Sequence, residues 1–262
     1  MSGKKKLDKE AKIARMERRI WISAILPMII TAIVLQFMPD MVPAHYDANG
    51  VVDRWGTKYE QFIFPGIIIL LSLGWMIYIR YYVKKIDTAK DMKEKAIIIS
   101  NSETLRWVAF LQNILFGVQQ CCIMLQAYRE ANKEVTDAKA TSTDNLIMMG
   151  FGIFVILIAN LLTKTRKNYV IGLRTKWSMY NDQTWRKSNF GGAICLIIAG
   201  LMTVVTSVIV KDVFLVKMIP MGYMFAAVLV AIVYSYRVYR MELEKENADN
   251  SEGSADKEKA EK

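Results

Sequence analysis

Six stretches of the sequence contain no charged side chain and no histidine, and this feature most limits how the chain can fold. Each stretch is 18 to 22 residues long. The hydrocarbon core of a membrane is about 30 Å thick and needs about 20 residues of apolar helix, so each stretch is long enough to cross it. The stretches are residues 20–38, 62–79, 107–128, 146–163, 190–210 and 218–236. The sequence therefore predicts an all-α polytopic membrane protein with six transmembrane helices.

Lysine and arginine are divided unevenly among the segments between these stretches. Of the 35 Lys and Arg residues, 28 lie in the two terminal segments and in the second and fourth connections. Because basic loops stay on the cytoplasmic side, both termini are predicted to be cytoplasmic. This placement accounts for the net charge of +10. We therefore expect membrane lipid as a partner and no direct binding of nucleic acid.

The distribution of charged and apolar residues divides the chain into four segments. Residues 1–19 are strongly basic and are predicted to form a helix along the inner leaflet. Residues 237–262 are rich in charge and poor in apolar side chains, which predicts a disordered cytoplasmic tail. Between them lie residues 20–105, with the first two spans and an extracytoplasmic loop at 39–61, and residues 106–236, with spans three to six and a cytoplasmic loop at 164–189.

The third span is the most polar of the six. Its amide side chains fall on one face of a helix, and lipid offers amides no hydrogen-bond partner, so they are expected to face other helices or a hydrated cavity. Structural hydrogen bonding between helices is favoured over a ligand groove. The amides are Gln112, Asn113, Gln119, Gln120 and Gln126. No span carries an ionisable acid or base, which argues against proton-coupled transport.

The extracytoplasmic loop is predicted to be ordered, because it contains two prolines and an Asn49-Gly50 turn. Its His45 is the only histidine in the chain, which excludes any site with two histidine ligands. A catalytic histidine also requires a positioned nucleophile, and none is identifiable. The three cysteines lie within spans, so no disulfide framework is expected. We expect no enzymatic activity, no metal and no cofactor.

Aromatic and basic residues alternate along the cytoplasmic loop. Asn181 or Asp182 is expected to cap a short helix that contains Trp185 and Arg186. Two interpretations remain open. The loop is either an ordinary basic loop with interfacial aromatic anchors or a surface that holds an acidic protein partner.

The two loops together resemble a known family. The outer segment P-x-x-V-P-x-H-Y-D-x-x-G-x-x-D-R-x-G-x-K begins at Pro39 and is similar to the domain of unknown function at the start of SdpI-type proteins. The inner segment N-Y-x-I-G-L-R-T-x-W-S…W-R-K begins at Asn168 and resembles the signature of the SdpI-type immunity protein family. Lys176 stands where the family usually has proline, and Asn189 stands where histidine is expected.

The resemblance implies a multi-pass protein of the bacterial plasma membrane that protects the cell from a secreted peptide toxin. In the best-known member the protein also sequesters a soluble transcriptional repressor at the membrane. The expected toxin-binding residues are Pro43, His45, Tyr46, Asp47, Gly50, Asp53, Arg54 and Lys58. The expected partner-binding residues are Asn168, Tyr169, Gly172, Arg174, Thr175, Trp177, Trp185, Arg186 and Lys187. A transporter of small molecules or peptides that uses the third span is the alternative function.

Overall fold

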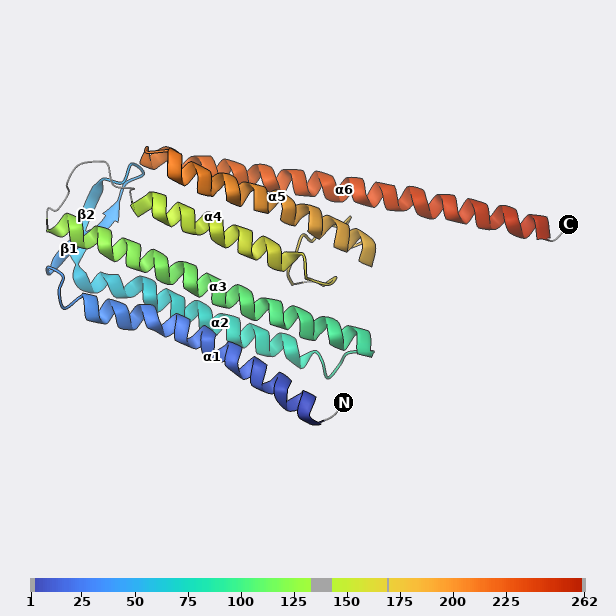
Figure 1. The fold of residues 1–262 in the computed structure, drawn as a ribbon, viewed down its shortest axis with the longest axis horizontal. Helices are drawn as coiled ribbons and strands as arrows, with labels where there is room; N and C mark the ends of the chain where they lie inside the picture. Colours follow the sequence, from blue (N-terminus) through green and yellow to red (C-terminus); the bar gives the residue numbers. More distant parts are fainter. Residues whose placement is uncertain (1–2, 133–142, 169, 261–262) are drawn as a thin grey trace.

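Six long helices lie side by side in the computed structural model, which describes residues 3–132, 143–168 and 170–260. Helix α1 begins and helix α6 ends at the same end of the bundle, opposite a small β-sheet (Figure 1). The helices are α1 (Gly3–Val34), α2 (Ile63–Lys84), α3 (Met92–Ala131), α4 (Thr143–Leu162), α5 (Asp182–Ile209) and α6 (Val213–Ala260).

The bundle consists of two groups of three helices. Helices α1, α2 and α3 pack on one another, and helices α4, α5 and α6 do the same. The main helix contact between the groups is that of α3 with α4, which lie next to each other in the middle of the bundle (Figure 1). We call these groups the N-terminal half and the C-terminal half.

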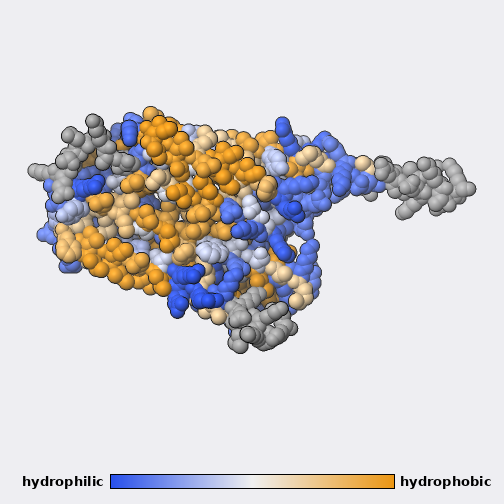
Figure 2. Space-filling view, in the orientation of Figure 1, coloured by the Kyte–Doolittle hydropathy of each residue, from blue (hydrophilic) through white to orange (hydrophobic). Residues whose placement is uncertain are grey.

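Within the described residues, five helices are long and apolar enough to cross a membrane, rather than the six predicted. Helix α1 is the exception because it ends at Val34 and its charged residues extend to Arg19. The apolar part from Ile20 to Val34 is about 22 Å long at 1.5 Å per residue, which is shorter than the hydrocarbon core. An apolar band covers the middle of the surface, and polar side chains gather at both ends (Figure 2).

The prediction that the chain is all-α is wrong at the outer loop. Strands β1 (Met41–Tyr46) and β2 (Val52–Thr57) form an antiparallel hairpin, which is followed by the 3-10 helix η1 (Lys58–Phe62). The loop was expected to be ordered, but each strand is only six residues long and neither alternates regularly between buried and exposed side chains, so the sequence did not indicate the strands.

The two charged terminal segments also differ from the predictions. Residues from Gly3 onward are helical, but they continue α1 without a break and pair with α3 through Lys12–Glu103 and Arg106–Glu17. At the other end α6 continues to Ala260, where a disordered tail was predicted. The tail is rich in Glu, Lys and Ala, which favour helix, and it extends a helix already fixed by packing, so no new nucleus is needed.

The amides of the third span hold the N-terminal half together. Asn113 is fully buried, accepts a hydrogen bond from Ser72 Oγ at 3.0 Å and donates one to Ile20 O at 3.1 Å. Gln120 is buried as well and donates to Thr31 Oγ1 and to Gln61 O. These bonds join α3 to α1, α2 and η1, as expected for structural hydrogen bonding.

The remaining amides of this set make fewer contacts between helices. Gln112 Oε1 accepts from Trp75 Nε1 at 3.1 Å, and Gln126 donates to Glu130 one turn further along α3. Gln119 has no hydrogen-bond partner among the described residues. The five amide side chains therefore do not form one continuous hydrogen-bond network.

Replacing Asn113 by alanine is expected to destabilise the protein by about 1 kcal/mol, because interhelical hydrogen bonds in membrane proteins contribute about that much. Unfolding by increasing SDS in mixed micelles measures the change. Gln119→Ala is the matched control and should change the free energy of unfolding by much less. Equal effects of the two substitutions would contradict the role assigned to Asn113.

Candidate functional site

A carboxylate side chain stabilises the turn of the outer hairpin by accepting backbone hydrogen bonds. Asp47 Oδ1 accepts hydrogen bonds from the backbone N–H groups of Asn49 at 2.9 Å and Val51 at 2.8 Å. These bonds, above all that from Val51, lower the pKa of the Asp47 carboxyl. Gly50 has a φ of 82°, a left-handed conformation that glycine adopts without strain. The Asn49-Gly50 turn predicted from the sequence is confirmed.

Side chains on both arms fix the hairpin to the N-terminal half. Val42 is fully buried in an apolar cluster with Leu35 and Met124. Lys58 Nζ donates to Met38 O at 3.3 Å and lies 3.1 Å from Asp40 Oδ1. The hairpin is therefore fastened to the end of α1 and to α3.

A second ion pair holds the end of the hairpin against the 3-10 helix. Both terminal nitrogens of Arg54 donate to the Glu60 carboxylate, at 3.3 and 2.9 Å. This bidentate pairing lowers the pKa of Glu60 and raises that of Arg54. Arg54 and Lys58, which were predicted to bind a toxin, thus have structural partners within the loop.

The tip of the hairpin reaches the C-terminal half. A Cβ atom on Gly50 would lie 3.1 Å from Val213 Cγ1 and 3.6 Å from Asp144 Oδ2, so the turn contacts the first turns of α6 and α4. Beside it the Tyr46 hydroxyl is buried, and its pKa is raised mainly by desolvation and also by the nearby Glu130 carboxylate. Asp144 pairs with Lys217 at 2.9 Å. The hairpin therefore contacts both halves at the end of the bundle opposite the chain termini.

The exposed part of the hairpin is smaller than the predicted set. His45 Nδ1 and Asp53 Oδ1 are 2.6 Å apart on the surface, with 64% and 47% of their side chains exposed. Several apolar or aromatic side chains that the sequence analysis did not select are also exposed, among them Val51, Trp55 and Tyr59. The sequence could have indicated these residues, because large apolar side chains in a polar loop often mark a binding surface.

The inner loop is folded by its own polar side chains. Asn168 is buried, its Oδ1 accepts from the N–H groups of Val170 and Ile171, and its Nδ2 donates to Arg166 O and Ile171 O. Ser178 is fully buried and exchanges hydrogen bonds with Thr175. Asn168 and Thr175 therefore shape the loop. Tyr169, the neighbour of Asn168 and a predicted binding residue, lies outside the described residues.

A glycine packed against a tryptophan and an asparagine forms the centre of this loop. Gly172 has a φ of 119°, and a Cβ atom there would lie 2.5 Å from Asn189 Oδ1 and 2.9 Å from the Trp185 ring. Trp185 is 2% exposed, and its Nε1 donates to Thr165 O at 3.1 Å. Asn189 Oδ1 accepts from Leu173 N at 2.7 Å. The asparagine that departs from the family pattern thus has a structural role here.

The helix that follows begins at the predicted cap but is not short. Asn181 caps α5 in a reciprocal arrangement with Thr184, and the helix continues as the fifth apolar span. Trp185 is therefore the first buried aromatic residue of a membrane-length helix rather than a side chain of a separate loop helix.

The inner loop contacts the N-terminal half. Val170 and Ile171 pack against the cluster of Ile79, Tyr82 and Leu105 on α2 and α3. Lys93 Nζ at the start of α3 lies 3.0 Å from Asp182 Oδ2 at the start of α5. The inner loop therefore joins the two halves at the end opposite the hairpin.

The long extension of α6 runs beside the same loop. Trp177 packs edge-to-face on Tyr236, and Tyr180 does so on Tyr239. The Tyr180 hydroxyl donates to Glu246 at 2.6 Å, and this carboxylate raises the pKa of the phenol. These contacts explain why α6 persists beyond its apolar part.

Basic side chains cover the outer surface of the inner loop. Arg174, Lys176, Arg186 and Lys187 are exposed. Lys187 Nζ lies 3.6 Å from Glu242 Oε2 of α6. Of the predicted partner-binding set, Arg174, Arg186 and Lys187 are thus on the surface, whereas Asn168 and Trp185 are buried. In the described part of the chain, no three His, Cys, Asp or Glu side chains are grouped closely enough to hold a metal ion.

Comparison with known protein families finds one match that contains the hairpin and another that contains the inner loop. Residues 22–69 match a domain of unknown function, DUF1648, and residues 164–237 match the SdpI/YfhL protein family. The resemblance to the SdpI family is confirmed. The chain is 22% identical over 212 residues to the immunity protein SdpI of Bacillus subtilis (strain 168), an alignment that covers 80% of this chain and 90% of the relative. No solved structure matches.

The family similarity and the helices agree on the class of protein. Five helices of membrane-spanning length, together with an alignment to an SdpI protein over most of the chain, support a multi-pass membrane protein. Each family match contains one of the two loops that join the halves, the first the hairpin and the second the inner loop.

Gly172→Ala is expected to lower the stability of the protein by at least about 1–3 kcal/mol, because alanine is strained at this φ and its Cβ would overlap Asn189 and Trp185. The effect is measured by heating the protein in detergent and then quantifying the fraction that remains unaggregated by size-exclusion chromatography. Gly66→Ala is the control, since a Cβ there meets nothing within 4 Å. A Gly172→Ala protein as heat-resistant as Gly66→Ala would refute this description of the loop.

Proposed function

We propose that this protein is an integral membrane immunity protein that protects a bacterial cell from a secreted peptide toxin. The observation that carries the proposal is the alignment with the Bacillus subtilis immunity protein SdpI over 80% of the chain. The protein acts by binding and not as an enzyme, since its single histidine is paired on the surface with Asp53 and, among the described residues, has no hydrogen bond to a serine, threonine or cysteine.

The proposed topology has six spans in the bacterial plasma membrane, with both termini in the cytoplasm. The excess of Lys and Arg in alternate segments supports this orientation. The location of the start of α1 and the end of α6 at one end of the bundle supports it as well (Figure 1). Although the apolar part of α1 is short, the long side chains of Arg18 and Arg19 next to it can extend to the headgroups and adapt it to the bilayer.

The toxin-binding surface that we propose is the exposed face of the outer hairpin. It combines an ionisable pair, His45 and Asp53, with the exposed side chains of Val51, Trp55 and Tyr59. Large aromatic side chains on a rigid hairpin are effective anchors, because little conformational entropy is lost when they bind. The other motif residues keep this face in place.

The inner loop is the proposed site for a soluble repressor. Its exposed basic residues, Arg174, Arg186 and Lys187, favour an acidic surface on that partner. Because the inner loop and the hairpin both contact the opposite half, a toxin that moves the hairpin tip on α4 and α6 can change the inner loop through the rigid helices of the C-terminal half.

Deletion of the gene in its host tests the proposal. The deletion strain should be killed by a membrane-active peptide in the culture supernatant of its own or a neighbouring strain at concentrations that the parent survives. Complementation with Trp55→Ala should restore little protection, because truncation of an aromatic anchor typically reduces affinity by about 30-fold.

Complementation with Tyr81→Ala provides the matched control, since this exposed aromatic residue lies at the far end of α2. It should restore protection fully at equal membrane abundance. Survival of the deletion strain in every supernatant that inhibits other strains would reject the immunity function. Full protection by Trp55→Ala would reject only the hairpin as the binding surface.

A further inference from the structure

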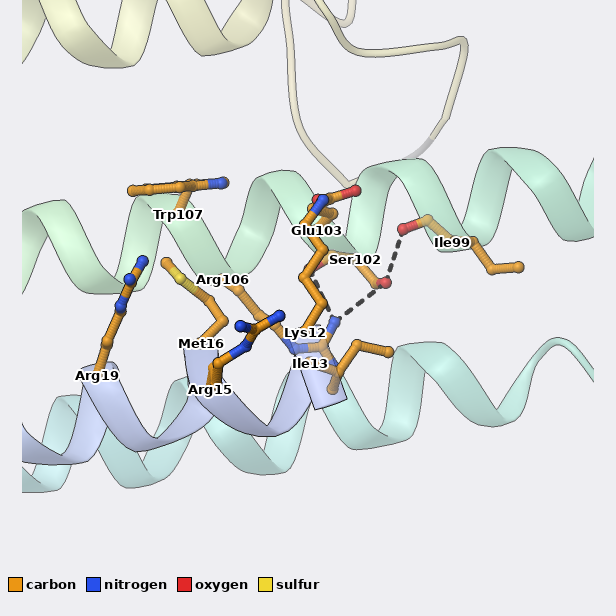
Figure 3. A pocket seen from close by; sticks show the side chains of 10 residues that line it. All are labelled: Lys12, Ile13, Arg15, Met16, Arg19, Ile99, Ser102, Glu103, Arg106 and Trp107. Carbon is orange, nitrogen blue, oxygen red and sulfur yellow. Dashed lines mark hydrogen bonds and ion pairs between the residues drawn. The ribbon is translucent and has the colours of Figure 1, made fainter. Parts of the chain in front are cut away.

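A cavity lies between α1 and α3 at the end of the bundle where the chain begins. Its volume is about 330 Å³, which is within the range of small-ligand sites. Figure 3 shows Arg15 and Arg19 extending from α1 on the side of α3, with Trp107 on the opposite wall. Ile13, Met16 and Ile99 supply apolar surface beside these polar groups.

The depth of the cavity along the helices matches the headgroup layer of a membrane. Arg19 is the last charged residue before the apolar part of α1, and Arg106 is the last before the apolar part of α3. Trp107, the next residue, is of the type that concentrates at the membrane interface. A ligand in this cavity would therefore have its polar end level with the lipid headgroups.

The charges in the cavity are only partly balanced. Lys12 pairs with Glu103, and Arg106 lies 3.1 Å from Glu17 Oε1 and also donates to Ser102. Arg15 and Arg19 have no hydrogen-bond or ion-pair partner in the described part of the chain. They are four residues apart on one helix, so their guanidinium groups lie on the same face.

We propose that this cavity binds one anionic phospholipid. The phosphate diester accepts hydrogen bonds from the guanidinium groups of Arg15 and Arg19, which present planar pairs of donors suited to phosphate oxygens. The acyl chains leave the cavity past Trp107 toward the apolar part of α1, which begins at Ile20, and Met16 packs beside the glycerol end of the lipid. The ring of Trp107 is at the level of the glycerol backbone.

A lipid fits these features better than a soluble anion does. The cavity combines two unpaired cations with an apolar wall at headgroup depth, and an inorganic phosphate would use only the cations. Basic pockets between helices on the inner side of a membrane characteristically hold anionic headgroups. The proposal depends on α1 lying in the membrane but not on the immunity function.

Native mass spectrometry of the purified full-length protein, titrated with phosphatidylglycerol or phosphatidylcholine in detergent, tests the site. The wild type should bind one phosphatidylglycerol at least about tenfold more tightly than phosphatidylcholine. Arg15→Gln/Arg19→Gln should weaken the binding of phosphatidylglycerol by about 30-fold, given about fivefold for each cation near an anionic lipid. Both arginines are exposed, so the heat stability of the lipid-free variant should equal that of the wild type.

The matched control is Arg18→Gln/Arg80→Gln, which removes the same charge from two exposed arginines outside the cavity. It should leave the affinity for phosphatidylglycerol within about twofold. Equal losses in the two double variants, or no preference of the wild type for phosphatidylglycerol, would overturn the proposal. So would displacement of phosphatidylglycerol by inorganic phosphate at equal concentration, since this would identify a site for a soluble anion.

Discussion

The seam between α3 and α4 is the contact on which the rest of the structure depends, because it is the main helix packing that joins the two halves. Apolar helices in a membrane gain little from burying their surfaces against one another, so such a seam relies on close packing and on polar contacts. The two motif loops supply those contacts where water is available. The hairpin tip at Gly50 reaches α4 and α6 at one end of the bundle, and the inner loop at Val170 reaches α2 and α3 at the other.

The hairpin and the inner loop have similar structural roles in this arrangement. Most of the motif residues keep these loops folded, as Asp47 does in the hairpin and Trp185 does in the inner loop. A smaller number of side chains, such as Trp55 in the hairpin and Arg186 in the inner loop, remain exposed on the surface. The proposed function, in which binding at one end of the bundle changes the loop at the other, requires such a rigid connection, because a flexible loop would absorb the movement.

The sequence predicted the helices well, because the cost of burying charge is local and leaves a direct pattern in the chain. Asn113 could likewise be assigned to interhelical hydrogen bonding, since an amide in lipid has no alternative. The hairpin, the short apolar part of α1 and the helical extension of α6 were missed. Each depends on contacts between distant residues, such as Val42 with Met124 and Tyr180 with Glu246, which no local pattern reveals.

Carbodiimide cross-linking of Lys93 to Asp182 in intact membranes tests the joining of the two halves most directly. Their side chains form an ion pair of 3.0 Å between α3 and α5, and carbodiimide converts such a pair into an amide. Lys12–Glu103, within the N-terminal half, is the internal standard. Mass spectrometry should find both cross-linked peptides in the wild type, and Gly172→Ala should reduce the first without the second. Cross-linking of Lys12–Glu103 alone in the wild type would contradict the account.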